Sequence, residues 1–431
     1  MRWLFLLSGG IRRRQSWLVT ALLFSSTAST AAAGLTFDEA LSTALRESAE
    51  VQAEAASVSA ARQAEGPADA LPDPILILGL DNVPIEGSDR YSLSRDFMTM
   101  QRVGVTQRFP NRSKLKARAS VASHQVGLAE SSAASTRLMV LRQTAQAWIA
   151  RHSLEQQLQL LNQLIEENRL LEQAVKARLS SGQGSALESV APRQEHARLL
   201  NRRDMLEAQR HQAIAQLTRW TGESGQRAVS GSAPEFMIDP AGLLAKLHAH
   251  PELEMARQQT RVASAAVDEA RAAKKPDWAL TLAYMDREDF SDMAMLQVNI
   301  DLPLFSGSRQ SPRIASAEAE RLASASRAEA VRREHESMLH SQLAYYERTE
   351  RVLSRQTDIL LPLAEEKVAL ATAAWRAGKG SLADVIQARS ELLDASLAVI
   401  ELTAERDQTA AALHFTYVHH ATMDEEENHA H

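Results

Sequence analysis

The sequence predicts a mainly α-helical protein that also contributes strands to a membrane β-barrel. Long stretches such as 112–222 and 309–415 are rich in Ala, Leu, Glu, Gln and Arg, a composition typical of long helices packed side by side. Four short stretches instead alternate apolar and polar residues, which predicts strands. The same series of segments occurs twice, so we expect two internal repeats, each with a strand pair and a long antiparallel helical hairpin.

Composition excludes several classes of protein. The chain has 431 residues of which 45% are hydrophobic, enough for roughly two or three domains with substantial cores. The net charge of −6 is spread along the chain without a basic cluster, so we expect no nucleic acid partner. There is no cysteine, which excludes disulfides, thiolate metal sites and an acylated N-terminal cysteine.

Residues 1–33 have the pattern of a signal peptide. A run of three arginines, 12–14, precedes the apolar stretch 17–24, and the small residues 31–33 offer a cleavage site. A retained membrane anchor is the alternative, but the apolar stretch is much shorter than the roughly 20 residues that a spanning helix needs. No later segment has the length and apolarity of a membrane helix.

Three pairs of similar stretches define the repeats. RLSSGQGSALESV at 178–190 is echoed by WRAGKGSLADVIQAR at 375–389, LPDPILILGL at 71–80 by KPDWALTLAY at 275–284, and MTMQRVGVTQ at 98–107 by MAMLQVNIDL at 293–302. The members of each pair lie roughly 200 residues apart. We therefore expect a first repeat at 34–222 and a second at 239–418. The glycines and prolines of 223–238 indicate an equatorial linker that crosses the outside of the helical bundle at mid-height.

Apolar spacing gives the helices. Steps of three and four residues, as in Leu138, Leu141, Ala145 and Trp148, predict coiled-coil-like packing. The expected helices cover 36–66, 112–181, 186–222, 239–273, 309–377 and 381–418. The longest would reach on the order of 100 Å and the shorter ones roughly 45 to 55 Å, so two short helices stacked end to end match one long helix. Pro362 predicts a kink.

The strand hairpins are expected within 73–109 and 277–305. Leu296, Val298 and Ile300 alternate with polar residues, which gives strands of roughly 9 to 11 residues with one apolar face, long enough to cross a bilayer when tilted. Trp278 and Tyr284 would lie about 20 Å apart, a spacing suited to the two aromatic girdles of a membrane barrel. A soluble sheet packed on a helix is the alternative. An open four-stranded sheet cannot span lipid, so membrane insertion requires several chains; three would close a barrel of about 12 strands.

The two repeated turns have a local structural explanation. Glycines allow a tight reversal between helices, and a serine followed three residues later by an acid forms a capping box. The glycines are Gly182, Gly184, Gly378 and Gly380, and the expected capping pairs are Ser185 with Glu188 and Ser381 with Asp384.

The order of these motifs resembles the TolC-like outer-membrane efflux factors. The resemblance rests on the doubled strand and helix hairpins, the signal peptide, and an arginine before each glycine turn: Arg178 before Gly182 and Arg376 before Gly378. It covers about 34–420. LPDP at 71–74 and the stretch 96–110 are similar to the branch of that family that serves heavy-metal cation efflux.

The resemblance implies a homotrimer that closes a 12-stranded barrel in the outer membrane of a Gram-negative bacterium and forms an α-helical periplasmic tunnel. Its expected partners are outer-membrane lipid, a periplasmic adaptor docked at the turns, and an inner-membrane pump of the resistance-nodulation-division class. It further implies a gate at Asp384 and Glu188, with Gln387 in place of a second expected acid. The expected function is a passive export duct.

The sequence contains no catalytic constellation and no phosphate-binding loop, so we expect neither an enzyme nor a cofactor. The tail 419–431 carries potential metal ligands, His419, His420, His429 and His431, beside acids at 424–427. A solvated tail is the alternative, and the same alternatives apply to His248 and His250. Acidic residues in the loops between strands would suit cation cargo.

Three other functions remain open. One is an outer-membrane factor for drugs or other small molecules. The two from other classes are a periplasmic adaptor, which also has a signal peptide and a helical hairpin, and a metal-buffering coiled-coil protein whose working part is the His-rich tail.

Overall fold

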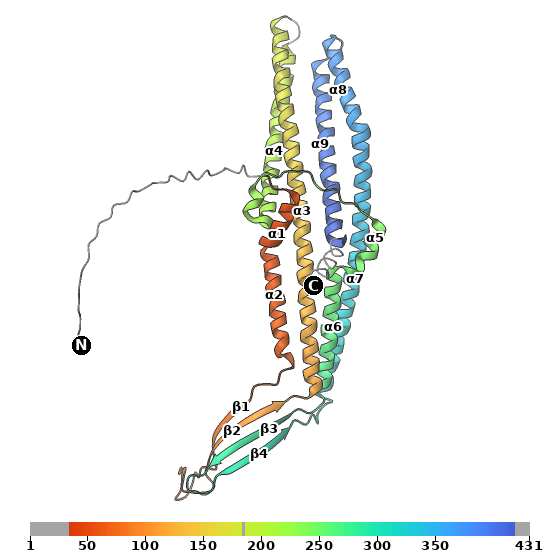
Figure 1. Cartoon of the computed structure of the whole chain (residues 1–431). Helices are drawn as coiled ribbons and strands as arrows, with labels where there is room; N and C mark the ends of the chain where they lie inside the picture. The colour runs from red at the N-terminus through yellow and green to blue at the C-terminus, as the bar shows by residue number, and fades with distance from the viewer. Residues whose placement is uncertain (1–33, 183–185, 419–431) are drawn as a thin grey trace, which may run out of the picture. The chain divides into compact units, whose positions relative to one another are not determined.

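The computed structural model describes residues 34–182 and 186–418. The expected signal peptide, the tail with His419, His420, His429 and His431, and the turn residues Gly184 and Ser185 lie outside the described residues. Within residues 34–418, long helices lie alongside one another and a four-stranded sheet continues from one end (Figure 1). No helix among the described residues combines the length and apolarity needed to cross a membrane.

The same order of elements occurs in both halves of the chain. The first half consists of α1 (Phe37–Glu47), α2 (Ala49–Glu65), β1 (Ile75–Asp81), β2 (Met100–Phe109), α3 (Arg112–Ser180) and α4 (Val190–Thr221). The second half consists of α5 (Pro240–Lys246), α6 (Pro251–Ala272), β3 (Trp278–Asp286), β4 (Met293–Ile300), α7 (Gln310–Arg355), α8 (Leu361–Arg376) and α9 (Leu382–Leu413).

Two helices that the sequence predicts as continuous are divided by N-cap residues. Ser48 has an extended backbone, and its side chain accepts a hydrogen bond from the N–H of Val51, so α1 ends and α2 starts there. His250 does the same between α5 and α6, where its Nδ1 accepts from the N–H of Glu252 at 3.2 Å. A side chain that satisfies the free N–H groups of a helix start stabilises the break.

Two further boundaries differ from the expectation. A 3₁₀ turn, Ala186–Ser189, precedes α4, which begins at Val190 rather than near 186. The helix expected over 309–377 is interrupted by a π-helical turn at Gln356–Leu360, directly before Pro362. Proline lacks an N–H and its ring crowds the carbonyl four residues earlier, so the regular α-helical bonding pattern cannot continue through this point.

The sheet has the order β1-β2-β3-β4 and is antiparallel throughout. One row of partners runs Leu76, Val105, Leu282 and Leu296 across all four strands, so their side chains share a face. That face is apolar and exposed: Leu282 is 56% and Leu296 68% accessible. On the opposite face, Thr281 is buried. Within the described residues β1 and β4 pair with one strand each, so both sheet edges are free.

The largest buried core group surrounds Trp148 of α3. Its ring is fully buried, packs edge-on against Phe37 at 5.5 Å, and donates from Nε1 to the carbonyl of Leu35 at 2.9 Å. Phe236, in the segment between α4 and α5, packs against both Phe37 and Phe415. The segment therefore passes beside α1 and the π-helical turn His414–Val418 that follows α9, which agrees with its course across the bundle in Figure 1.

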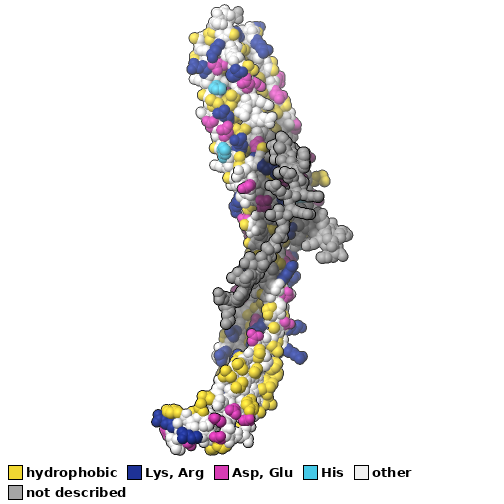
Figure 2. Space-filling model, turned by 60° about the vertical axis from the view of Figure 1, so that its left-hand side comes forward, with side chains coloured by type: hydrophobic (Ala, Val, Ile, Leu, Met, Phe, Trp, Pro, Cys, Tyr) yellow, Lys and Arg dark blue, Asp and Glu magenta, His cyan; other side chains and the backbone are white. Residues whose placement is uncertain are grey.

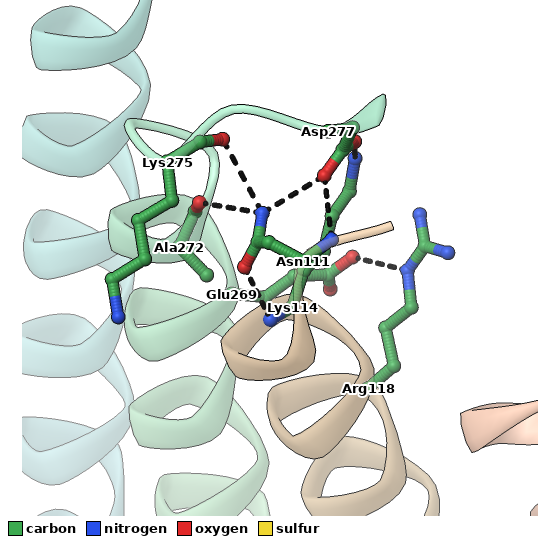
Figure 3. Close-up of polar contacts among 7 residues, drawn as sticks. All are labelled: Asn111, Lys114, Arg118, Glu269, Ala272, Lys275 and Asp277. Atoms are coloured by element: carbon green, nitrogen blue, oxygen red, sulfur yellow. Dashed lines mark hydrogen bonds and ion pairs between the residues drawn. The ribbon is translucent and has the colours of Figure 1, made fainter. Parts of the chain in front are cut away.

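A polar cluster fixes the sheet to the helices (Figure 3). Asn111 caps α3 through Oδ1 and donates from its backbone and side-chain nitrogens to Asp277 Oδ1 at 2.8 and 2.9 Å. Lys114 pairs with Asp277 Oδ2 at 2.8 Å, and Asn111 also reaches the carbonyl of Ala272 at the end of α6. The start of α3, the end of α6 and the start of β3 therefore meet in one hydrogen-bonded joint.

Candidate functional site

The two helical turns at the end of the bundle distant from the sheet lie next to each other. Gly182 follows α3 with a φ of +76°, and Gly378 follows α8 with a φ of +70°, conformations that favour glycine. The guanidinium of Arg178 lies 4.7 Å from the ring centre of Trp375, a cation–π contact between the two hairpins. We name this region, residues 175–182, 186–190 and 371–391, the tip.

Arg376 and Gly380, which were also expected to contact the adaptor, lie at the tip as well. Arg376 is exposed and has no hydrogen bond or ion pair within the described residues. A Cβ added to Gly380 would lie 3.1 Å from Ala374 Cβ, so this glycine permits close packing of the turn against α8.

The expected capping box is present at the start of α9. Ser381 Oγ accepts from the N–H of Asp384 at 3.1 Å, and Asp384 Oδ2 accepts from the N–H of Ser381 at 3.0 Å. The Ser381 hydroxyl also donates to Asp384 Oδ2 at 2.8 Å, and this bond, followed by the one from the Ser381 N–H, lowers the pKa of the exposed Asp384 carboxyl. Glu188 is partly buried within the 3₁₀ turn and has no hydrogen bond or ion pair among the described residues, so the two acids differ in their surroundings.

Gln387 belongs to a row of hydrogen-bonded polar side chains that was not predicted from the sequence. Its amide donates to Glu391 Oε1 at 3.1 Å, and Lys367 of α8 reaches Glu391 Oε2 at 2.5 Å. Lys367, and after it Gln387, lowers the pKa of the Glu391 carboxyl. Glu391, one helical turn after Gln387, thus supplies the carboxylate that Gln387 lacks. The two residues are four apart on one helix, and this spacing could have predicted their contact.

Two ion pairs connect the two hairpins, and one of them starts from Arg389 within the tip. Arg202 of α4 lies 2.5 Å from Asp394 of α9, and Arg389 of α9 lies 3.9 Å from Glu167 of α3. They lie near a leucine core that contains Leu158, Leu161, Leu199, Leu206, Leu393 and Leu397. The partners are far apart in sequence, so no local pattern could have identified them.

Both expected girdle residues lie on the exposed apolar face of the sheet. Trp278 is 45% accessible and stacks on Phe109 with ring centres 4.2 Å apart; Tyr284 is 52% accessible, and its hydroxyl bonds to Asp292. Figure 2 shows hydrophobic side chains gathered toward the sheet on one face.

The two ends of the sheet differ in charge. The loops far from the helices carry six acids, Glu86, Asp89, Asp96, Glu288, Asp289 and Asp292, and Asp81 and Asp286 end the strands that lead into them. The junction with the helices carries cations whose side chains have no hydrogen bond or ion pair among the described residues: Arg108, Arg112, Lys274, Arg309 and Arg313.

One group of potential metal ligands forms among the described residues. His250, Glu252 and His335 offer ligand atoms that lie within 4.8 Å of one another, midway along the helices and away from the tip. His248 is exposed and does not join them.

Comparison with known proteins identifies the family. The family model described as "Outer membrane efflux protein" matches residues 40–223 and 245–416. The chain therefore belongs to the outer membrane efflux protein family. Its proteins are TolC-like passive channels of tripartite efflux systems, and not enzymes. In this family, channels are typically homotrimers that work with periplasmic adaptors and inner-membrane pumps of the resistance-nodulation-division class.

Solved structures share the fold. A membrane protein from Pseudomonas aeruginosa aligns with a TM-score of 0.77, covering 88% of this chain and 89% of that one. CusC aligns with a TM-score of 0.75, covering 88% and 91%, and the outer membrane protein VceC from Vibrio cholerae with 0.74, covering 88% and 95%. Each is 18% identical to this chain. No curated protein matched in a sequence comparison.

Proposed function

We propose that three copies of this chain form an outer-membrane channel that exports heavy-metal cations. One observation carries the proposal: the sheet exposes a continuous apolar face while both of its edges are free. In lipid every backbone N–H and C=O must be paired within protein, so such a sheet is stable in a membrane only if its edges pair with neighbouring chains. Three four-stranded sheets make a closed barrel of about 12 strands.

The lipid contact follows from the same face. Leu282, Leu296 and their neighbours would face acyl chains, with Trp278 and Tyr284 near the two interfaces. The unpaired cations at the sheet–helix junction would lie beside phospholipid headgroups of the inner leaflet, to which their charge is complementary.

Cation cargo is supported by the acidic loops. The six acids within these loops outnumber the three arginines there, Arg90, Arg95 and Arg287, while Asp81 is paired with Arg102 at 3.1 Å. A mouth with this sign of charge raises the local concentration of cations. Selectivity itself would come mainly from the partner pump, because a passive wide duct discriminates little between small solutes.

The tip would form both the adaptor-docking surface and the entrance. Its paired glycine turns expose Arg376, while Arg178 and Trp375 hold the two hairpins together below them. We propose that the hairpins separate when the entrance opens, and that Asp384 narrows the closed entrance.

Two fractionation outcomes test the channel. On unheated gels of outer-membrane fractions, we expect the protein to run as a detergent-resistant trimer that dissociates on heating. A monomer in the soluble periplasmic fraction would instead favour an adaptor or a metal-buffering protein.

For the cargo, a strain lacking the chain should become sensitive to Zn²⁺, Co²⁺, Ni²⁺ or Cu²⁺. Sensitivity restricted to drugs would assign the chain to the alternative cargo.

The gate needs a pair of variants, because Asp384 also caps α9. Asp384→Asn removes the charge and retains a good capping side chain, whereas Ser381→Ala removes the cap and retains the charge. If charge closes the entrance, Asp384→Asn raises the resting conductance in planar bilayers and Ser381→Ala does not. Equal conductance of both variants and the wild type would remove Asp384 from the gate.

A further inference from the structure

Two buried histidines and a glutamate meet between α6, α7 and the π-helical turn His414–Val418, which follows α9. His250 and His335 are 6% and 5% accessible, and their rings lie 4.3 Å apart at an angle of 44°. Glu252 is partly buried between them, and its Oε2 lies 2.8 Å from His335 Nε2. Histidine side chains that are nearly inaccessible and face a carboxylate are uncommon on a bundle whose other polar groups are mostly solvated.

Neighbouring groups orient the cluster and leave parts of it unsatisfied. Ser135 of α3 donates to Glu252 Oε1 at 3.3 Å, which leaves Oε2 to face His335. His335 Nδ1 and the hydroxyl of Tyr417 are buried without a hydrogen-bond partner among the described residues. The Tyr417 ring packs 5.6 Å from His250 and 6.5 Å from His335, so it covers the cluster from the π-helical turn after α9.

Glu252 is ionised at neutral pH. Its hydrogen bond with His335 holds the pKa of this carboxyl well below its usual range, although burial acts in the opposite direction. A half-buried carboxylate beside two imidazoles presents the charge and the lone pairs that a cation requires.

We propose that His250, Glu252 and His335 bind one divalent transition-metal ion of the Zn²⁺ class. Two imidazole nitrogens and one carboxylate oxygen form a ligand set suited to Zn²⁺ and the related ions Co²⁺, Ni²⁺ and Cu²⁺. Ca²⁺ and Mg²⁺ prefer oxygen ligands only, and the soft ion Cu⁺ prefers sulfur. The ion would replace the proton shared between His335 Nε2 and Glu252 Oε2, and Ser135 would orient the carboxylate as an outer partner.

Binding requires a local rearrangement at His250. A tetrahedral site with bonds of about 2.0–2.1 Å places its ligand atoms roughly 3.4 Å apart, closer than the 4.8 Å spread found here. His250 Nδ1 caps α6 through the N–H of Glu252, and ligation would exchange this bond for the metal. Pro251 at the first position of α6 has no N–H to satisfy and a φ suited to a helix, so the helix start tolerates the exchange.

The bound ion would join α6 to α7 at a point covered by Tyr417. Glu252 and His335 are separated by 83 residues, so the ion would close a long loop within a single chain. This inference stands apart from the proposed transport function, because all three ligands come from one protomer and the site is neither at the tip nor on the sheet.

Co²⁺ titration of the detergent-purified full chain tests the site, with no affinity tag that contains histidine and after removal of bound metal by chelation. Four proteins are compared: the wild type, His335→Gln, Glu252→Gln, and His340→Gln as the matched control. His340 is an exposed histidine on the same helix as His335. The tail histidines are present in all four, so their binding is common to all.

The wild type and His340→Gln should each show the intense visible absorption of tetrahedral Co²⁺, at one ion per protomer, that Zn²⁺ displaces. His335→Gln and Glu252→Gln should lose this band and bind at least about tenfold more weakly. Zn²⁺ should also raise the Tm of the wild type more than that of either variant. Identical spectra and affinities in all four proteins would overturn the proposal. If His335→Gln does not fold, Glu252→Gln, which keeps the size and hydrogen-bonding shape of the side chain, decides alone.

Discussion

Reversing the charge of Arg202 tests whether the contact between the two hairpins holds the entrance closed. Arg202 and Asp394 lie 2.5 Å apart with side chains 35% and 60% accessible, so each pair contributes about 0.2–1 kcal/mol as an exposed ion pair. Three pairs in a trimer sum to about 0.6–3 kcal/mol, which corresponds to about a 3-fold to 150-fold change in the ratio of open to closed channels. Arg202→Glu should therefore raise the ratio of open to closed channels by at least about threefold.

The assay is single-channel conductance in planar bilayers at 0.15 M and 1 M salt, where the screening lengths are about 8 Å and 3 Å. Arg203→Glu is the matched control, because Arg203 lies on the same helix and, among the described residues, pairs only with Asp204 and Glu207 of that helix. The exchanged pair Arg202→Asp with Asp394→Arg should restore the closed state. The reasoning is refuted if Arg202→Glu and Arg203→Glu behave alike, or if the effect of Arg202→Glu is as large at 1 M salt as at 0.15 M.

Three further outcomes follow from the sheet and the tip. Leu296→Arg should reduce the trimer in outer-membrane fractions because a cation facing mid-membrane lipid costs about 2–4 kcal/mol, whereas Gln297→Arg on the opposite face should not. Gly378→Ala should destabilise the tip by about 1–2 kcal/mol, because its φ of +70° strains an L side chain, and should speed proteolysis there. Ser381 lowers the pKa of Asp384, so the ionised Asp384 carboxylate stabilises the start of α9. This stabilisation is present above the ordinary pKa of 3.8 and is lost as the pH falls through the depressed pKa. Hydrogen-exchange protection at the start of α9 should fall over that range, and Ser381→Ala should weaken this dependence, because the backbone N–H of position 381 still donates to Asp384.

Periodicity was sufficient to predict the long helices and the strand faces. Steps of three and four residues along α3, and strict alternation in β4, reflect which side of an element is packed, and both patterns are local. The capping box at Ser381 was predictable for the same reason, since both partners lie within four residues. The helix breaks at Ser48 and His250 were missed because the apolar pattern continues on both sides of them.

Contacts between distant segments could not be predicted. His335 meets Glu252 across 83 residues and Arg202 meets Asp394 across 192, and no spacing rule covers such distances. Histidines of the tail and of LHAHPEL were considered as metal ligands from the sequence. Only the packing of α6 against α7 brings His335 to Glu252. The π-helical turn before Pro362 likewise depends on how α7 and α8 pack, although the proline marked its position.

The two free edges of the sheet have a genetic consequence. If β1 of one chain must pair with β4 of the next, a ring closes only when every member presents two sound edges. A copy with a damaged β4 but intact helices would still assemble with normal copies and would leave the ring open. In a cell that makes both forms, such an allele should be dominant, while an allele that prevents the helices from folding should be recessive.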